Sequence, residues 1–103
     1  LALAPYDARA LSSLGHLLGR MGRREEAGRL LKLLGEMYGK GRNLGYSIAL
    51  VRMGLGDRAG ALEWLEKAAE TREPILPFVV VEPRFATLRG EARYGAVVRK
   101  LGL

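Results

Sequence analysis

The sequence repeats a pattern of small and apolar residues at a fixed interval. Each of two segments contains a glycine, an alanine five residues later, and further apolar residues at helical spacing. The equivalent positions are Gly22 and Gly56, Ala27 and Ala61, Leu31 and Leu65, and Leu34 and Ala68, with Leu14-Gly15 upstream matching Ile48-Ala49. The period is 34, and a fixed period of this length is typical of units that stack on one another. The chain is therefore predicted to be built of repeats.

The clearest copy of the unit lies at residues 55–70. Gly56 and Asp57 are typical turn residues. The apolar residues after them recur at three- and four-residue intervals, which places them on one face of a helix: Ala61, Leu62, Leu65, Ala68 and Ala69. Small side chains on such a face let another helix axis come close. We interpret this stretch as the second helix of a helical hairpin.

These residues resemble the tetratricopeptide repeat, with its Leu-Gly pair, loop glycine, alanine and large apolar residue four positions later. The resemblance implies an all-α fold of two antiparallel helical hairpins, residues 8–41 and 42–75, stacked as a short solenoid. Residues 76–103 would form an irregular cap with a C-terminal helix, and residues 1–103 a single domain. Gly45 stands where the family has a large aromatic residue, so we expect a hollow there unless Tyr38 or Tyr46 fills it.

The apolar spacing predicts helices at about residues 8–21, from residue 23 to a break at 38–43, at 44–53 and at 58–71. The first is expected to bury Ala10, Leu11, Leu14, Leu17, Leu18 and Met21. The second is expected to bury Ala27, Leu30, Leu31, Leu34 and Met37. The third is apolar nearly all round, which predicts that it is covered on both sides.

Residues 76–103 do not continue the pattern. Pro74, Pro77 and Pro83 interrupt an apolar run, which predicts a short helical turn followed by an extended piece near residues 79–81. Further apolar residues are expected to cover Trp64 and the open end of the stack: Phe85, Leu88, Tyr94, Val97, Val98 and Leu101.

The same segment resembles the closing part of a group of bacterial proteins. Its Pro83-Arg84-Phe85 and Leu88-Arg89 are similar to motifs in the C-terminal repeat regions of multidomain signalling proteins, which carry a winged-helix, nucleotide cyclase or kinase domain upstream. The second proline of that pattern is missing from residues 91–94. The chain begins with Leu1, and we expect it to be a piece of a longer protein.

Charge and cysteine content narrow the classes of partner. The net charge is +6, and it is uneven: residues 1–41 hold seven bases and four acids, residues 42–75 five of each, and residues 76–103 five bases and two acids. There is no cysteine, which excludes disulfides and thiolate metal sites and fits a cytoplasmic location. No run approaches the ~20 apolar residues of a membrane span, so we expect no membrane insertion.

The sequence predicts no enzyme, metal site or cofactor. His16 is the sole histidine, and although Ser12 lies one helical turn before it, no carboxylate in the same helix is placed to orient the ring. Residues 39–45 are rich in glycine but lack the Lys-Ser or Lys-Thr ending of a phosphate loop. Neither pattern indicates catalysis.

The resemblance instead implies a protein-interaction module. In the family, the first helices of the hairpins line a concave groove that holds a peptide or a partner helix. The corresponding residues here are Arg9, Ser12, His16, Arg20, Asn43, Tyr46, Leu50 and Met53. The Lys and Asn that bind a peptide's C-terminal carboxylate in one branch of the family are replaced by Ser12 and His16, so that mode is not expected.

Two alternatives use other surfaces. Apolar residues 75–81 exceed what one helix needs, which favours a homodimer or larger oligomer. Nucleic acid could bind the basic residues near the C-terminus: Arg84, Arg89, Arg93, Arg99 and Lys100. The spacing of Phe85 and Tyr94 suits a core better than base stacking, which disfavours this second alternative.

Overall fold

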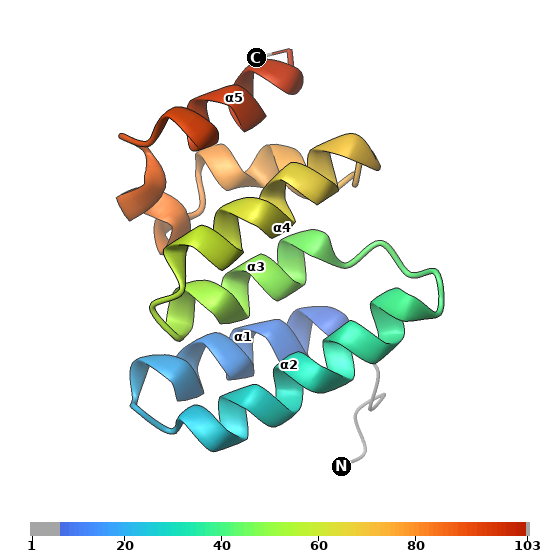
Figure 1. Ribbon diagram of the computed structural model, residues 1–103, viewed down its shortest axis with the longest axis vertical. Coiled ribbons are helices and arrows are strands. Elements are labelled where there is room, and N and C mark those ends of the chain that lie inside the picture. The colour runs from blue at the N-terminus through green and yellow to red at the C-terminus, as the bar shows by residue number, and fades with distance from the viewer. Residues whose placement is uncertain (1–6, 103) are drawn as a thin grey trace.

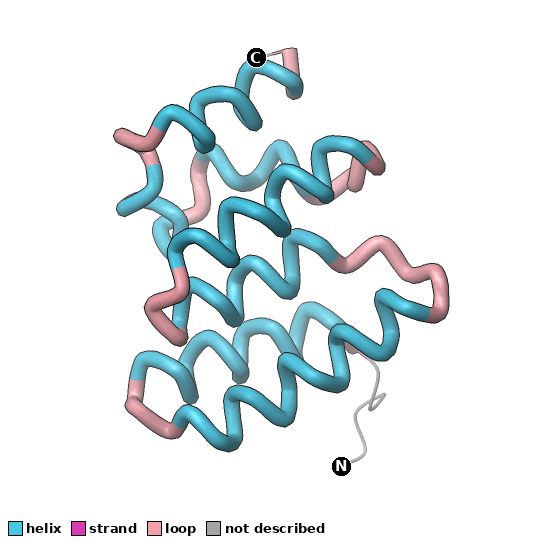
Figure 2. The backbone as a smooth tube through the Cα atoms, viewed as in Figure 1, coloured by secondary structure: helices cyan, strands magenta, loops and turns pink. Residues whose placement is uncertain are grey.

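The computed structural model describes residues 7–102, and helices are the regular secondary structure of this part of the chain, with no strand among these residues, which confirms the predicted all-α class (Figures 1 and 2). Its elements are the α-helices α1 (Ala8–Arg20), α2 (Arg24–Gly39), α3 (Gly45–Gly54), α4 (Arg58–Glu70) and α5 (Ala92–Lys100), with the 3-10 helices η1 (Leu76–Val80) and η2 (Pro83–Leu88) between α4 and α5.

The helices form two hairpins and a C-terminal segment. Helices α1 and α2 lie side by side, as do α3 and α4, and α1 packs along α3 to join the two hairpins (Figure 1). The 3-10 helices pack on α3 and α4, and α5 packs on α4. The molecule measures 39 × 29 × 20 Å, and the two hairpins and the C-terminal segment follow one another along its long axis.

The turns inside the two hairpins have the same geometry. Gly22 and Gly56, which occupy equivalent positions of the two repeats, both have φ of +79°, a backbone region that favours glycine. The N–H of Arg23 donates to the Leu18 carbonyl, and the N–H of Asp57 donates to the Arg52 carbonyl, each at 2.9 Å. These are equivalent helix-ending bonds. The period seen in the sequence is therefore also a period of the backbone.

The hairpins meet through glycine. A Cβ atom on Gly15 would lie 2.8 Å from Val51 Cγ2, and one on Gly19 would lie 2.6 Å from the Gly54 carbonyl carbon. No real side chain fits at such distances, so α1 and α3 approach more closely than larger residues would allow. We call this contact the glycine joint; on α1 it is made by Ser12, Gly15 and Gly19, all buried.

The stripe predicted to be buried on α1 is largely wrong. Leu18 is buried, but Leu14, Leu17 and Met21 are 47%, 54% and 59% exposed, and Ala10 is exposed as well. The reason is that the small residues of α1, rather than its leucines, face α3. The side of α1 that carries the exposed leucines has no described element packed against it.

The predicted extended piece at residues 79–81 is also wrong. Residues 76–80 form η1, in which the N–H groups of Phe78 and Val81 donate to carbonyls three residues earlier. Pro77 stands in the first turn, where a missing N–H costs no hydrogen bond. The expected cover is otherwise present: Phe85, Leu88, Tyr94 and Val97 are buried, while Val98 and Leu101 pack beside them.

No hollow exists at Gly45. A Cβ atom there would lie 2.8 Å from a Glu73 carboxylate oxygen and 2.9 Å from the Trp64 carbonyl oxygen, so the approach of α4 uses the space. The Trp64 ring is itself covered by Tyr38 of α2, edge to face at 4.9 Å between ring centres, and by the Lys67 ammonium group at 4.3 Å. A tryptophan expected under the C-terminal segment thus also joins the hairpins.

Candidate functional site

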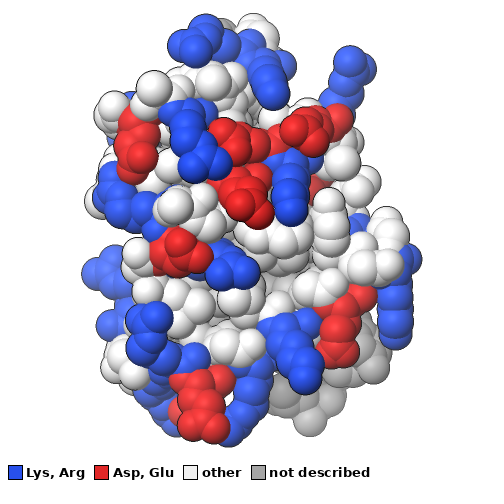
Figure 3. All heavy atoms as spheres, in the orientation of Figure 1, with Lys and Arg blue, Asp and Glu red and all other residues white. Residues whose placement is uncertain are grey.

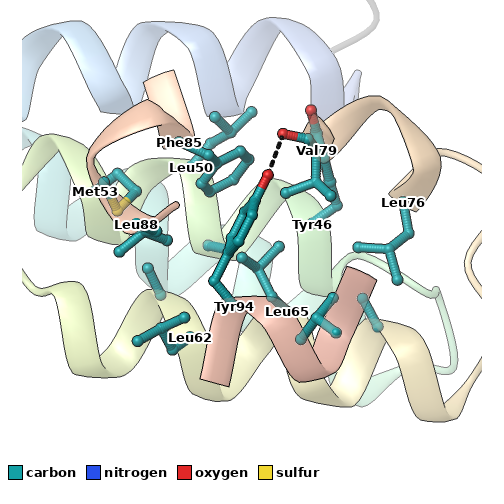
Figure 4. Close-up of a cluster of buried hydrophobic side chains, with 14 residues drawn as sticks. Tyr46, Leu50, Met53, Leu62, Leu65, Leu76, Val79, Phe85, Leu88 and Tyr94 are labelled. Carbon is teal, nitrogen blue, oxygen red and sulfur yellow. Dashed lines mark hydrogen bonds between the residues drawn. The ribbon is translucent and has the colours of Figure 1, made fainter. Parts of the chain in front are cut away.

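The predicted groove on α3 is filled by the chain itself. Tyr46, Leu50 and Met53 are buried in one cluster with side chains of η1, η2 and α5 (Figure 4). The ring of Tyr46 lies 5.3 Å from that of Phe85, at 69°. Since Phe85 is fully buried there, these three positions of α3 belong to the core and are closed to a partner in this structure.

Polar contacts hold the C-terminal segment in place. The Tyr94 hydroxyl donates to the Val79 carbonyl at 3.3 Å, which ties α5 to η1 (Figure 4). The Arg58 guanidinium of α4 donates to the Thr87 carbonyl and to Glu91. Arg93 pairs with Glu66 through two hydrogen bonds of 2.9 and 2.6 Å. The segment is thus fixed to α4 as well as to α3.

The four predicted positions on α1 differ in exposure. Arg9 and Arg20 are exposed, His16 is half-buried, and Ser12 is buried in the glycine joint. The Ser12 hydroxyl donates to the Arg9 carbonyl at 3.0 Å, a bond within its own helix. In this structure the serine hydroxyl is therefore directed to a backbone carbonyl.

A cleft of about 590 Å³ opens where the first turns of α1 and α3 meet the C-terminal segment. It contains five of the eight predicted residues: Arg9, Ser12, Asn43, Tyr46 and Leu50. His16, Arg20 and Met53 lie outside it. The remainder of its wall includes Ser13, Ile75, Phe78, Glu82 and Arg84, which the groove prediction missed. We call this hollow the α1–α3 cleft.

The C-terminal segment supplies an ion pair to the cleft. Arg84 donates to Glu82 at 2.7 Å and to the Ser13 hydroxyl at 3.3 Å, which links η2 to α1. The hydrogen bond from Arg84 holds the pKa of the Glu82 carboxyl below its usual value, and the same bond raises the pKa of Arg84. Both groups therefore stay charged at neutral pH, and each largely neutralises the charge of the other.

His16 stands beside this pair. Its pKa is lowered by burial, and next by the positive charges of Arg84 and Arg20, while Glu82 acts in the opposite direction. The imidazole is therefore neutral at pH 7. The neutral His16 ring, beside two arginines, therefore has no positive charge with which to bind an anion.

The Glu73 side chain caps the N-terminus of α3, although it lies 28 residues after Gly45 in the sequence. Its carboxylate, buried to 3% exposure, accepts the N–H of Gly45 at 2.7 Å and that of Tyr46 at 3.1 Å. Leu44, the residue before the helix, has no side-chain bond to offer, so Glu73 takes the part of the N-cap. A negative charge also suits the positive end of the helix dipole. Glu73 is therefore a structural group in the cleft wall.

The acids of the cleft are all engaged, but Arg9 is exposed at its rim. Asp7 accepts the N–H groups of Arg9 and Ala10, Glu73 caps α3, and Glu82 holds Arg84. Phe78 offers a ring that is 58% exposed. The arrangement can receive an apolar side chain and a negative group, with hydrogen bonds from Ser13 and Asn43.

A second hollow, of about 460 Å³, lies at the start of α2, where charged lining residues pair with one another, Arg23 with Glu26 and Arg29 with Glu25. On the face shown in Figure 3, acidic and basic side chains are interspersed. Ion pairs on the described surface include Arg23–Glu26, Arg58–Glu91 and Arg93–Glu66. Among residues 7–102 no group of three or more His, Asp or Glu side chains is placed to hold a metal ion. Within the same residues, no helix has the length and apolar character needed to cross a bilayer.

The chain matches no family model, no curated protein and no solved structure. The tetratricopeptide resemblance stays a prediction.

Proposed function

We propose that this chain is a non-catalytic, tetratricopeptide-like module that binds an extended peptide in the α1–α3 cleft. The observation that carries the proposal is the exposed Phe78 ring in a cleft of about 590 Å³, next to an exposed arginine and to hydroxyl and amide side chains. A peptide offers an apolar side chain and backbone groups at spacings of a few ångström, which such a wall can receive.

The family part of the proposal has separate support. In both hairpins the first helix ends in the same glycine turn, and the equivalent alanines of the two repeats, Ala27 and Ala61, are both fully buried. A period of 34 with these small residues is the pattern of the repeat. The expected groove over α3 is filled, so the module proposed here binds at the edge of that groove rather than along it.

The charge of the ligand can be inferred from the acidic side chains of the cleft, which already have hydrogen-bond partners in the protein. Glu73 and Glu82 are satisfied within the protein, Asp7 caps α1 through one carboxylate oxygen, and Arg9 is exposed at the rim. We therefore infer a peptide with a carboxylate near an apolar residue. The carboxylate would pair with Arg9, and the apolar side chain would lie against Phe78.

A displayed library of random peptides, selected on the immobilised chain, tests this. Selected peptides should contain an acidic and an apolar residue, and calorimetry should show binding weakened by about tenfold or more in Phe78→Ser and in Arg9→Glu. Leu14→Ser, which removes an exposed apolar side chain on α1, is the matched control and should bind normally. Binding that survives both cleft variants would refute the site.

Self-association is a second candidate, favoured by the exposure of Phe78 on η1 and of Val81 directly after it. Sedimentation at two concentrations distinguishes it: a dimer that Val81→Ser dissolves would identify this segment as an interface. The nucleic-acid alternative has less support. Arg84 and Arg93 form ion pairs with Glu82 and Glu66, and Arg89 donates to the Val80 carbonyl, so these basic groups are partly neutralised or engaged.

A further inference from the structure

The open face of α1 combines an apolar stripe with one positive charge. The stripe consists of Leu14, Leu17 and Met21, all exposed. Their spacing of three and four residues places them in one row, about 10 Å long at the rise of an α-helix. Arg20, exposed in the last turn of α1, lies one turn after Leu17 on the same face. A partner of this face has to fit both features.

Helix α3 shows how the same positions of the repeat are used when they are covered. One period later they are Ile48, Val51, Gly54 and Leu55. Ile48 and Val51 are buried in a cluster with side chains of α2. Gly54 lies against backbone, because a Cβ atom there would be 2.7 Å from the His16 Cα. The close approach of the first hairpin to α3 therefore requires a glycine at this position.

Arginine takes the place of that glycine on α1. Because Arg20 is the equivalent of Gly54, no helix can come as close to this face of α1 as α1 comes to α3. A helix that covers the stripe must stay at the distance set by large side chains, about 10 Å between the two axes. The leucines and the methionine of the stripe suit that distance, since they fill the space between the helices.

The charge of Arg20 specifies what else the partner needs. Within the described residues 7–102, no hydrogen bond or ion pair joins the Arg20 side chain to another group. Covering an unpaired guanidinium with apolar side chains alone is costly. A carboxylate removes that cost, because it can accept two parallel hydrogen bonds from a guanidinium. The charge therefore indicates a partner with an acidic side chain beside its apolar row.

A second copy of α1 does not supply that carboxylate. Residues 8–20 contain two arginines and no acid, so two α1 helices packed face to face would bring like charges together. A lipid surface fits no better. A helix that lies in a bilayer interface presents a broad apolar face, whereas the small residues of α1 pack on α3 and leave one row of three large side chains.

We propose that the stripe of Leu14, Leu17 and Met21 docks an amphipathic, acidic helix of another protein. Apolar residues of that helix, spaced by three and four positions, lie along the stripe, and a glutamate or aspartate on its flank pairs with Arg20. None of these four residues lines the α1–α3 cleft, so this surface is separate from the proposed peptide site.

Two synthetic peptides of about 18 residues, or five helical turns, test the role of charge. Both carry one row of leucines and a side-chain staple on the opposite face, which holds the helix. One has glutamate beside the row and the other lysine. In fluorescence anisotropy with the 103-residue chain, the glutamate peptide should bind about tenfold or more tightly than the lysine peptide.

A charge reversal on the protein gives the sharper result. In Arg20→Glu the preference should change to the lysine peptide, because the pairing partner is now reversed. Arg99→Glu is the matched control. It changes an exposed arginine in the last turn of α5 and alters the net charge by the same amount, so the glutamate peptide should remain preferred.

A third pair of variants tests the stripe. Leu17→Ser should weaken binding of the glutamate peptide by about tenfold or more, and should leave the urea midpoint of the chain unchanged because that side chain is exposed. Phe78→Ser, in the α1–α3 cleft, should leave this affinity unchanged. Chemical shifts in α1 should move when the peptide is added.

Several results would overturn the proposal. These are failure of both peptides to bind, equal binding of the two, or a preference that Arg20→Glu does not reverse. A dimer that Leu17→Ser dissociates would assign the stripe to a second copy. Pelleting with vesicles of phosphatidylglycerol and phosphatidylcholine, abolished by Leu17→Ser, would assign it to a membrane. None of these results decides peptide binding in the cleft, which Phe78→Ser and Arg9→Glu test separately.

Discussion

The two sides of α3 pack in opposite ways, one through small residues and the other through large ones. Toward α1 the contact is the glycine joint, where backbones touch and no side chain separates them. Toward the C-terminus α3 presents Tyr46, Leu50 and Met53, which large residues of η1 and η2 cover. Small residues require a straight helix as partner, because only a regular rod can lie close along its length. Large residues accept an irregular partner whose side chains fill the spaces between them.

The comparison explains why the chain changes architecture after α4. A third hairpin would need small residues on the outer face of α3, in the manner of Gly15 and Gly19. Tyr46 and Met53 occupy such places, one period after Ser12 and Gly19. The bulk of these side chains prevents the next helix from coming close, and two 3-10 helices with proline in their first turns fill the space instead.

Phe85→Ala gives the largest expected effect, because it empties the centre of the bulky contact. Removing a fully buried phenylalanine ring should lower the free energy of unfolding by about 3–5 kcal/mol, measured by urea denaturation. Hydrogen exchange should quicken first in η2 and α5, while the glycine joint keeps its protection. Equal loss of protection in α1 would show that the two sides of α3 form one unit and would break the comparison.

Gly54→Ala tests the glycine joint itself. A Cβ atom at residue 54 would lie 2.7 Å from the His16 Cα, so the helices must separate, at a cost of about 1–3 kcal/mol in unfolding free energy. The matched control is Gly35→Ala on α2, where nothing lies within 4 Å, and which should instead gain about 0.5–1 kcal/mol. The same sign for both would mean that the joint tolerates side chains.

Glu73→Gln weakens the hydrogen bonds that residue 73, beyond α4, accepts from the first turn of α3. The amide oxygen can still accept a hydrogen bond but carries no charge for the start of α3, so we expect a loss of about 1.5 kcal/mol in chemical denaturation. Chemical shifts of Gly45 and Tyr46 should move, whereas those of Gly19 should not. An unchanged stability would show that the start of α3 needs no cap.

His16 gives the smallest effect, and it reports on the boundary between the two contacts. Its pKa is lowered in the folded protein by burial and by Arg84, so the unfolded chain binds the proton more readily. Stability from this group should be complete above the unfolded pKa of about 6.5 and fall as pH drops below it. His16→Gln should flatten that part of the pH profile, and nuclear magnetic resonance titration should give a pKa below the unfolded value.

Much of the scaffold could be predicted because the repeat is local. Turn glycines, the alanines in the first turn of each second helix and the approximate hairpin limits all follow from spacings within one repeat. What spacing cannot give is the identity of the neighbour. Leu14 and Ile48 have the same place in the pattern, yet one is exposed and the other buried, because only the second has a described hairpin in front of it.

The candidate site was predicted in part for the same reason. Arg9 and Ser12 line the cleft from α1 and Asn43 lines it from the loop before α3, while Tyr46 forms its floor against Phe85. Glu73 acts on Gly45 from beyond the next helix, and no local pattern indicates such a bond. Proline spacing predicted interruption after α4 but not 3-10 geometry, since proline suits both an extended chain and a first helical turn.

The position of Glu73 has a consequence for dividing this polypeptide. Glu73, which caps the first turn of α3, lies beyond the end of α4. The second hairpin therefore depends on a carboxylate outside its own two helices. A boundary placed at Glu70, where the helix ends, would leave the middle of the molecule to fray even though every helix of both hairpins had been retained. Fragments intended to fold should therefore run past residue 73.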